Sequence, residues 1–350
     1  MSVKPEEFSC PLPVTDHDTV QLAHGSGGRL TAELVEKFFL PRFANPTLAR
    51  LEDQAVLECP GGRLAFTTDT FVVEPLFFPG GTIGDLAVNG TVNDVAMGGA
   101  KPLWLSAAFV IEEGLPLATL HGVLLAMEQA ARAAGVSIVT GDTKVVGKGA
   151  CDKLFINTTG LGVVPEGVTL SAANLQPGDA VFLSGTIADH GMAILTSREG
   201  LSFASRIESD TAALHGLVAA MLSVCPELRA LRDPTRGGVA TTLNEFARSS
   251  GVGIVLREEA IPVRPAVRAA CELLGIDPLY VANEGKLIAV APAAKAEAVL
   301  AAMRAHPLGR DGVRIGEVRA ENPGLVAMRT ALGTHRIVDM PVGEQLPRIC

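Results

Sequence analysis

The stretch Pro165-Glu166-Gly167 to Gln176-Pro177-Gly178-Asp179 interrupts the regular pattern of this chain and divides it in two. Each proline lacks an amide donor and disfavours helix in the residue before it, and Pro-Gly clusters are typical of loops between structural units. We therefore predict a domain boundary here, with a first domain at 46–167 and a second at 168–338. An N-terminal segment, 1–45, and a tail, 339–350, complete the 350 residues.

Both halves combine strand and helix patterns. The first half predicts helix 30–39, a hairpin of 55–57 with 64–68, helix 82–98, strand 104–111, helix 118–134, and strands 136–139 and 154–164. The second half predicts strand 180–184, helices 186–198, 209–224 and 236–249, strand 252–256, helix 265–274, strand 286–290, helix 293–305, and strands 313–319 and 324–330. The fold class that follows is α+β, in two domains.

The composition excludes several classes of protein. Hydrophobic residues make up 48% of the chain and aromatic residues 4%, which suits helices packed on sheets rather than disorder. The net charge of −9 disfavours nucleic acid and anionic membranes as partners. The start, Met1 to Glu7, lacks the apolar core of a signal peptide, and no apolar run reaches the ~18 residues of a membrane helix. We expect a cytoplasmic protein.

The six cysteines form no Cys-x-x-Cys pair and show no zinc-site spacing, which indicates reduced thiols. One of them, Cys350, is the last residue of a tail that carries Pro341, Gly343 and Pro347. Ten extended residues reach about 33 Å. A thiol on such a tether is suited to collect a chemical group from another protein and deliver it to a pocket of its own. The alternative is an incidental cysteine on a frayed terminus.

Four aspartates stand at glycine-rich or strand-end positions. Asp69 ends a predicted strand, Asp94 lies on a helix before Gly98-Gly99, Asp142 follows a predicted strand, and Asp233 precedes a predicted helix. Carboxylates in such settings suit Mg²⁺ that bridges phosphate oxygens, and helix N-terminal amides bind anions. For any single aspartate, the alternative is a helix cap or a turn residue.

Standard nucleotide motifs are absent. The segment Gly141 to Gly149 resembles a P-loop, but its spacing is one residue too long and Gly149 replaces the metal-binding Ser or Thr. The segment Gly25 to Leu30 lacks the third glycine and the preceding strand of a dinucleotide fingerprint. If a nucleotide is bound, it is bound by a motif other than these two.

Two further charged residues are candidates for chemistry. Lys144 stands two residues after Asp142, so both side chains share a face if the segment is extended. Glu284 precedes a predicted strand and is a candidate base. For both, the alternative is a solvated surface charge.

Taken together, these segments resemble the HypE family of hydrogenase maturation proteins, the carbamoyl dehydratases, within the PurM-like superfamily of aminoimidazole ribonucleotide synthetase and selenophosphate synthetase. The resemblance covers nearly the whole chain. It rests on His24-Gly25-Ser26-Gly27-Gly28, Thr68-Asp69-Thr70, Gly84-Asp85-Leu86, Val92-Asn93-Asp94-Val95-Ala96-Met97-Gly98-Gly99, Gly141-Asp142-Thr143-Lys144-Val145-Val146, Asp233-Pro234-Thr235-Arg236-Gly237-Gly238, Asn283-Glu284-Gly285-Lys286 and Pro347-Arg348-Ile349-Cys350. The glycine-rich head and the terminal motif are the most specific of these.

The resemblance implies a fold and a set of ligands. The fold is PurM-like: the first domain contributes to the β-barrel of a homodimer, the second is an α/β sandwich-type domain, and the tail is flexible. ATP lies between domains, under the glycine-rich head. Residues at nucleotide-binding positions are His24, Gly25, Ser26, Gly27, Gly28, Asp69, Asn93, Asp94, Asp142, Thr143 and Asp233. Those at Mg²⁺ positions are Asp69, Asp94, Asp142 and Asp233.

The resemblance also implies a reaction. A carbamoyltransferase, HypF, places a carbamoyl group on Cys350, and ATP drives its dehydration to an S-cyanide. The cyanide then passes to a HypC–HypD complex for the iron of a [NiFe] hydrogenase. Glu284 and Lys144 match the positions that handle protons, and Cys350 is a carrier.

Two other interpretations stay open at this point. A different superfamily synthetase, for ribonucleotide or selenophosphate, needs no terminal thiol, and the selenophosphate enzymes use a reactive Cys or selenocysteine in the loop that here runs from His24 to Arg29 without one. A non-catalytic carrier would shuttle a group on Cys350 but would not need the acidic set.

Overall fold

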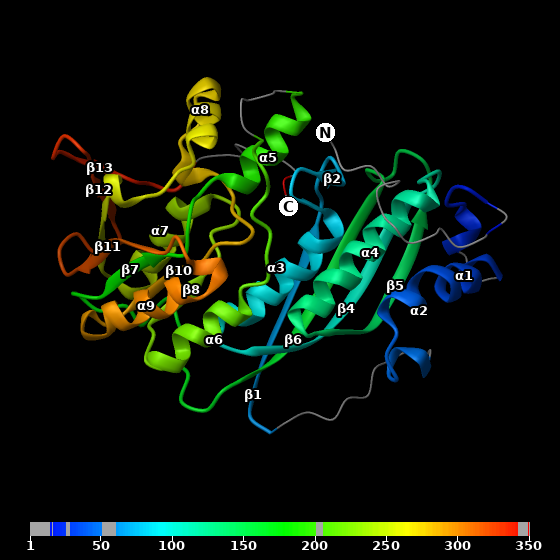
Figure 1. The fold of residues 1–350 in the computed structure, drawn as a ribbon, viewed down its shortest axis with the longest axis horizontal. Helices are drawn as coiled ribbons and strands as arrows, with labels where there is room; N and C mark the ends of the chain where they lie inside the picture. The colour runs from blue at the N-terminus through cyan, green and yellow to red at the C-terminus, as the bar shows by residue number, and fades with distance from the viewer. Residues whose placement is uncertain are drawn as a thin grey trace.

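The computed structural model describes residues 15, 17–25, 29–50, 61–200, 206–341 and 349. These form two domains, each built on its own β-sheet, and the predicted α+β class is confirmed (Figure 1). The segment 165–179 carries neither helix nor strand and joins the two sheets.

In the first domain the elements are η2 (Leu22–Gly25), α1 (Arg29–Leu34), the π-helical η3 (Val35–Phe39), α2 (Leu40–Phe43), η4 (Leu48–Arg50), β1 (Arg63–Phe71), β2 (Phe77–Phe78), β3 (Gly81–Thr82), α3 (Ile83–Met97), β4 (Lys101–Glu112), α4 (Leu117–Ala134), β5 (Ser137–Val146) and β6 (Leu154–Val164). The sheet has the order β1-β6-β4-β5, and α3 and α4 lie side by side on one of its faces (Figure 1). The remaining face of this sheet is not covered by α3 or α4.

Helix α3 begins and ends where the sequence predicts. The Thr82 hydroxyl accepts hydrogen bonds from the amides of Gly84 and Asp85, and the Asp85 carboxylate accepts from the amide of Thr82, a capping box that fixes the first turn. Thirteen of its residues are buried, because the helix packs on its own sheet with one side and on the second domain with the other. It is therefore the element that joins the domains.

In the second domain the elements are β7 (Ala180–Leu183), α5 (Asp189–Arg198), α6 (His215–Val224), β8 (Ala230–Arg232), α7 (Gly238–Ser250), β9 (Gly253–Arg257), η5 (Glu258–Ala260), α8 (Pro265–Leu274), η6 (Pro278–Tyr280), β10 (Ile288–Ala291), η7 (Ala293–Lys295), α9 (Ala296–Ala305), η8 (Pro307–Gly309), β11 (Val313–Arg319), β12 (Val326–Arg329) and β13 (His335–Ile337). The strand order is β13-β12-β9-β11-β7-β10-β8. Apolar side chains of α7 pack on one face of this sheet, and those of α6 and α9 pack on the other.

Several predicted elements differ in extent. Strand 136–139 is part of the longer β5, so Asp142 and Lys144 lie inside a strand rather than after one. Asp69 lies two residues before the end of β1. The helix predicted at 209–224 begins only at His215, and the segment before it runs as a loop along the domain junction.

The predicted hairpin of 55–57 with 64–68 stays a prediction, because one of its two arms lies outside the described residues. Residues 64–68 belong to β1, which pairs with the distant β6, whereas 55–57 lie outside the described residues.

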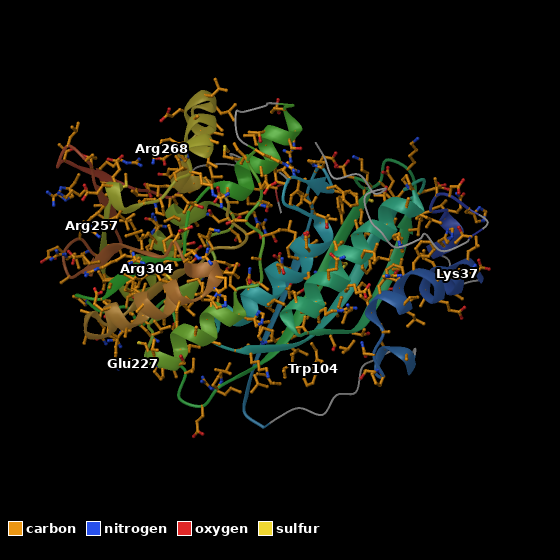
Figure 2. The ribbon with its side chains drawn as sticks, viewed as in Figure 1. Lys37, Trp104, Glu227, Arg257, Arg268 and Arg304 are labelled. Carbon is orange, nitrogen blue, oxygen red and sulfur yellow. The ribbon has the colours of Figure 1, made fainter. Side chains whose placement is uncertain are left out.

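The outer ends of the molecule carry charge: Figure 2 shows Lys37, on η3, and Arg257, at the end of β9, at opposite ends.

Candidate functional site

Two of the predicted aspartates meet where β1 packs on α3. The Thr67 hydroxyl donates to Oδ2 of Asp94 at 3.0 Å, and Thr67 and Asp69 share the helix-facing side of β1 because side chains alternate along a strand. Burial raises the pKa of both carboxyls, and the charge of Asp69 raises that of Asp94 further. The structure therefore places Asp69 and Asp94 as electrostatic neighbours at the inner edge of the first domain.

A third predicted aspartate, Asp233, comes from the second domain. It lies between β8 and α7 and is 6% exposed. Burial, and then the charge of Asp94, raises the pKa of Asp233 to about 7. A cation bound between Asp94 and Asp233 would relieve this repulsion and favour their ionised forms.

Glu284 adds a fourth acid to this cluster. It is 2% exposed, and its Oε1 has no hydrogen-bond partner among the described residues. Burial raises the pKa of Glu284 well above its usual range, with further contributions from Asp233, Asp210, Asp69 and Asp94. We call Asp69, Asp94, Asp233 and Glu284 the acidic cluster.

The backbone around Glu284 is held from both domains. Its amide donates to Oδ1 of Asp210 at 3.1 Å, and its carbonyl accepts from the Asn93 side chain at 3.1 Å. A Cβ on Gly285 would lie 1.6 Å from the Asp210 carbonyl oxygen, so only glycine allows this approach. Lys286 pairs with the buried Asp210 carboxylate at 3.5 Å.

The side chain of Asn93 forms hydrogen bonds with backbone groups and does not face an open space. Its Nδ2 also donates to the carbonyl of Ala212 at 3.0 Å, and its Oδ1 accepts from the amide of Leu214 at 2.7 Å. The side chain is fully buried and ties α3 to the second domain. A direct contact of Asn93 with nucleotide stays a prediction.

The other predicted acid, Asp142, lies elsewhere. In the sheet, Asp142 is level with Ala108 of β4, Asn157 of β6 and Thr70 of β1, so roughly 14 Å of sheet separates it from β1. Its side chain is 62% exposed and pairs with Lys144 at 2.8 Å, and this hydrogen bond lowers the pKa of Asp142. The predicted shared face of Asp142 and Lys144 is confirmed.

Asp142 and the acidic cluster also face opposite sides of the sheet. Asp69 is paired with Thr158, whose hydroxyl donates to the Ala87 carbonyl of α3, so this row faces the helices. Asp142 belongs to the adjacent row, which alternation turns to the uncovered face. One chain in this conformation therefore does not bring Asp142 or Lys144 to Glu284.

A cavity of about 260 Å³ adjoins Asp142 on the helix side of β5. Its lining includes Thr31 of α1, Phe39 of η3, Phe43 of α2, Phe109 of β4 and Thr143 of β5. A Cβ on Gly141 would lie 2.2 Å from the Ala107 carbonyl oxygen, so a glycine is needed where β5 approaches β4 most closely. The cavity is mostly apolar and also has threonines in its lining, which suits a flat heteroaromatic ring.

The glycine-rich head is described in part. His24 is buried, and its Nδ1 accepts from the amide of Gln21 at 2.9 Å. Gly25 ends η2, whereas Ser26, Gly27 and Gly28 lie outside the described residues. Cys350 also lies outside them.

Ile349 is described, and it is not exposed. The side chain is 4% exposed and belongs to the apolar cluster that contains Phe78 and Ala282. Its carbonyl oxygen lies 2.6 Å from Nε2 of His190, on α5. Ile349 is thus held at the junction of the two domains, beside the loop that leads to Glu284.

The sequence did not single out Asp210 or His190. Both fell within predicted helices, at 209–224 and 186–198, where a polar residue is unremarkable. The available signal was the acidic-polar run Ser209-Asp210-Thr211, which lies outside α6 in the structure.

A bound metal ion needs several ligand side chains, so a single acid is not a site. Among the residues that the structure describes, no group of three or more His, Cys, Asp or Glu side chains is arranged to hold an ion by itself. The carboxylates of Asp69, Asp94 and Asp233 nevertheless fit Mg²⁺ in their chemistry, because they supply the oxygen ligands that the ion prefers and a cation would relieve the repulsion of Asp94 and Asp233. Within the same described part of the chain, no helix is long and apolar enough to cross a membrane.

Comparison with known families and proteins agrees with this architecture. Residues 51–164 match the N-terminal domain, and 176–327 the C-terminal domain, of the AIR synthase related protein family. The chain is 59% identical, over 332 residues and 95% of both chains, to "Carbamoyl dehydratase HypE" of Cupriavidus necator.

Solved structures show the same similarity. The crystal structure of the hydrogenase maturation protein HypE in complex with ATP superposes with a TM-score of 0.92, at 51% identity, over 95% of this chain and 100% of that one. A chain of the HypE–HypF complex superposes with a TM-score of 0.78, at 50% identity, over 90% and 100%. The chain therefore belongs to the HypE family of hydrogenase maturation proteins, the carbamoyl dehydratases, and has their two-domain PurM-like fold.

Proposed function

We propose that this protein uses ATP to dehydrate a carbamoyl group, carried on the sulfur of Cys350, to an S-cyanide that supplies a [NiFe] hydrogenase iron. The observation that carries this proposal is the position of Ile349. It is buried at the domain junction, and Cys350 follows it by one peptide bond. The loop before Glu284 is bound to α5, because the amide of Gly191 on that helix donates to the carbonyl of Ala282, two residues before Glu284.

The reaction balances with ATP as the acceptor of water. The amide oxygen attacks the γ-phosphorus, the bond from that phosphorus to the ADP oxygen breaks, and an O-phosphorylated imidate forms after loss of one amide proton. Loss of the second proton expels phosphate and leaves the nitrile. The products are S-cyanide, ADP and phosphate, and phosphate is a far better leaving group than oxide.

Glu284 and Lys144 are the residues that we assign to proton transfer. Glu284 presents an unpartnered carboxylate oxygen inside the junction, where it is available to a bound amide. Lys144 carries its cation on the uncovered face of β5 and is held by Asp142. Both assignments rest on the match to the family pattern and on this placement.

We further propose that Asp69, Asp94 and Asp233 hold Mg²⁺ with the phosphates, and that Asp142 contributes from another chain. Bound there, the ion would supply positive charge to the transferring phosphoryl group. The support is the repulsion among these carboxylates, which a cation relieves.

The nucleoside is proposed to occupy the cavity between α1–α2 and β5. Thr143 and the apolar rings of that cavity would contact the base, with His24, Gly25, Ser26, Gly27 and Gly28 over the nucleotide. The related chain crystallised with ATP supports nucleotide binding by this protein.

A homodimer would unite the separated halves. β1 and β5 are the two edges of the described sheet, and its uncovered face exposes Leu64 (54%) and Phe66 (70%). Two such sheets meeting face to face and edge to edge form a barrel, which buries these residues and removes free edges. The cavity, Asp142 and Lys144 of one copy would then serve the acidic cluster of the other.

The partners follow from the same scheme. A HypF-type carbamoyltransferase would load Cys350, as the solved HypE–HypF complex of a relative suggests, and a HypC–HypD complex would accept the cyanide. The tail would leave the junction to reach both.

The test is the mass of the C-terminal peptide after incubation with HypF, carbamoyl donor and ATP. A change on Cys350 from carbamoyl to cyano, with one phosphate released for each, is expected. Cys350→Ala should abolish both signals and leave ATP binding intact. If the carbamoyl group on wild-type Cys350 persists in the presence of ATP, the protein is a carrier of that group and not a dehydratase.

A further inference from the structure

The residue that holds the end of the chain is His190. It is fully buried on α5, and its Nε2 lies 2.6 Å from the carbonyl oxygen of Ile349. A carbonyl oxygen only accepts, so Nε2 must carry the proton. On the other side of the ring, Nδ1 lies 2.8 Å from the Ser209 hydroxyl.

The direction of the whole hydrogen-bond chain is therefore fixed. Burial lowers the pKa of His190, so the ring is neutral and its Nδ1 accepts from Ser209. The Ser209 oxygen in turn accepts from the amide of Thr211 at 3.2 Å. The imidazole is held in one tautomer, and its Nε2–H donates to the Ile349 carbonyl.

Packing fixes the ring as well. Phe78 of β2 meets His190 edge to face, with centroids 5.7 Å apart and planes at 88°. The amide of Ser209 donates to the carbonyl of Pro79 at 2.8 Å, which ties this segment to the first domain. Figure 1 shows β2 and α5 at the junction between the two domains.

The same loop supports the acidic cluster. Ser209 orients His190, and the next residue, Asp210, accepts from the amide of Glu284. The residue that orients His190 and the residue that supports the Glu284 backbone are thus consecutive, so the position of one restricts the position of the other.

We propose that His190 is a positioning residue: with Ser209 it forms a latch that holds the Ile349 carbonyl and so sets where Cys350 stands relative to Glu284. The latch makes no contact with the reacting atoms. Its catalytic consequence rests on the proposed function, but its hold on the chain end does not.

The first arm of the test measures the hold alone. Full-length protein is treated with N-ethylmaleimide, and the alkylation rate of Cys350 is followed by the mass of the C-terminal peptide. His190→Leu should raise that rate by about 10-fold to 100-fold, the factor for one buried carbonyl left unpaired. Cys151, half-exposed on a loop of the first domain, is the internal control and should keep its rate.

Two variants distinguish a hydrogen bond from general packing. His190→Gln retains an N–H donor and should alkylate within about 3-fold of wild type. Ile349→Ala removes an apolar anchor at the chain end and should accelerate alkylation by about 10-fold. Unfolding of His190→Leu would be seen as alkylation of the buried Cys225 and Cys271. In that case the alkylation rates of Ile349→Ala and His190→Gln test the latch instead.

The second arm follows single-turnover cyanide formation from protein already carbamoylated on Cys350. His190→Leu should slow it by about 10-fold, with ATP affinity unchanged and with rescue by His190→Gln. Equal alkylation of Cys350 in wild type and His190→Leu overturns the latch, as does equal acceleration by Leu and Gln. A wild-type protein that shows the alkylation pattern but never forms cyanide instead overturns the proposed function.

Discussion

The acidic cluster and the Asp142–Lys144 pair both contain aspartate, but their carboxyl groups are in opposite physical states. In the cluster, burial raises the pKa values of all four carboxyls, neighbouring carboxylates raise those of Asp94, Asp233 and Glu284 further, and Oε1 of Glu284 has no hydrogen-bond partner among the described residues. On β5, Asp142 is solvated and already paired with Lys144, which lowers its pKa. A cation would relieve the repulsion in the first group, whereas the second is already neutralised and lies away from Glu284 within the chain. This difference is the basis for our proposal that the two regions are halves of sites shared between copies.

Glu284→Gln is expected to produce the largest effect. The substitution keeps the size of the buried side chain but removes its capacity to accept a proton. Carbamoylated protein should accumulate, with cyanide formation slowed by roughly 10²-fold to 10⁴-fold, the range for general acid–base catalysis. Rapid-quench mass analysis of the Cys350 peptide measures it. Turnover at the wild-type rate would remove Glu284 from the mechanism.

Mixing two inactive variants tests whether the halves come from different chains. Dimers of Glu284→Gln with Lys144→Ala would contain one doubly defective site and one intact site. After exchange of subunits at equal concentrations, roughly a quarter of wild-type sites should be restored, since half of the dimers are mixed. Each variant incubated alone is the control. No recovery, despite mixed dimers seen by native mass spectrometry, would place both residues in one chain.

The sequence predicts local features of this fold well. Helices α3, α4 and α8 begin and end within a residue of the expected positions, because an apolar stripe and a cap such as Thr82 or Gly135 are local signals. β5 is longer than predicted because the glycine and polar residues around Asp142 conceal a strand pattern.

What the sequence does not provide is which face an acid occupies. Asp69 and Asp142 both follow small or hydroxylated residues in extended segments, and only the register with β6 and β4 turns them to opposite sides. The loop before α6 is a second example. Asp210 fell in a predicted helix, although its role in holding the Glu284 amide depends on a contact between residues far apart in sequence.

Asp142→Asn should have the smallest effect on folding. Its ion pair with Lys144 is exposed on both sides, 62% and 65%, and such pairs contribute about 0–1 kcal/mol. Asp179→Asn is the matched control: Asp179 is 3% exposed, accepts from the Gln176 amide at 2.8 Å and pairs with Arg229 at 3.2 Å. Losing that buried charge should cost about 2 kcal/mol or more. Urea unfolding of both variants gives the comparison.

Because Asp142 is assigned to a site completed by a second copy, its variant should lose ATP-dependent turnover while its unfolding midpoint stays at the wild-type value. A midpoint lowered as far as that of Asp179→Asn would make Asp142 a structural residue.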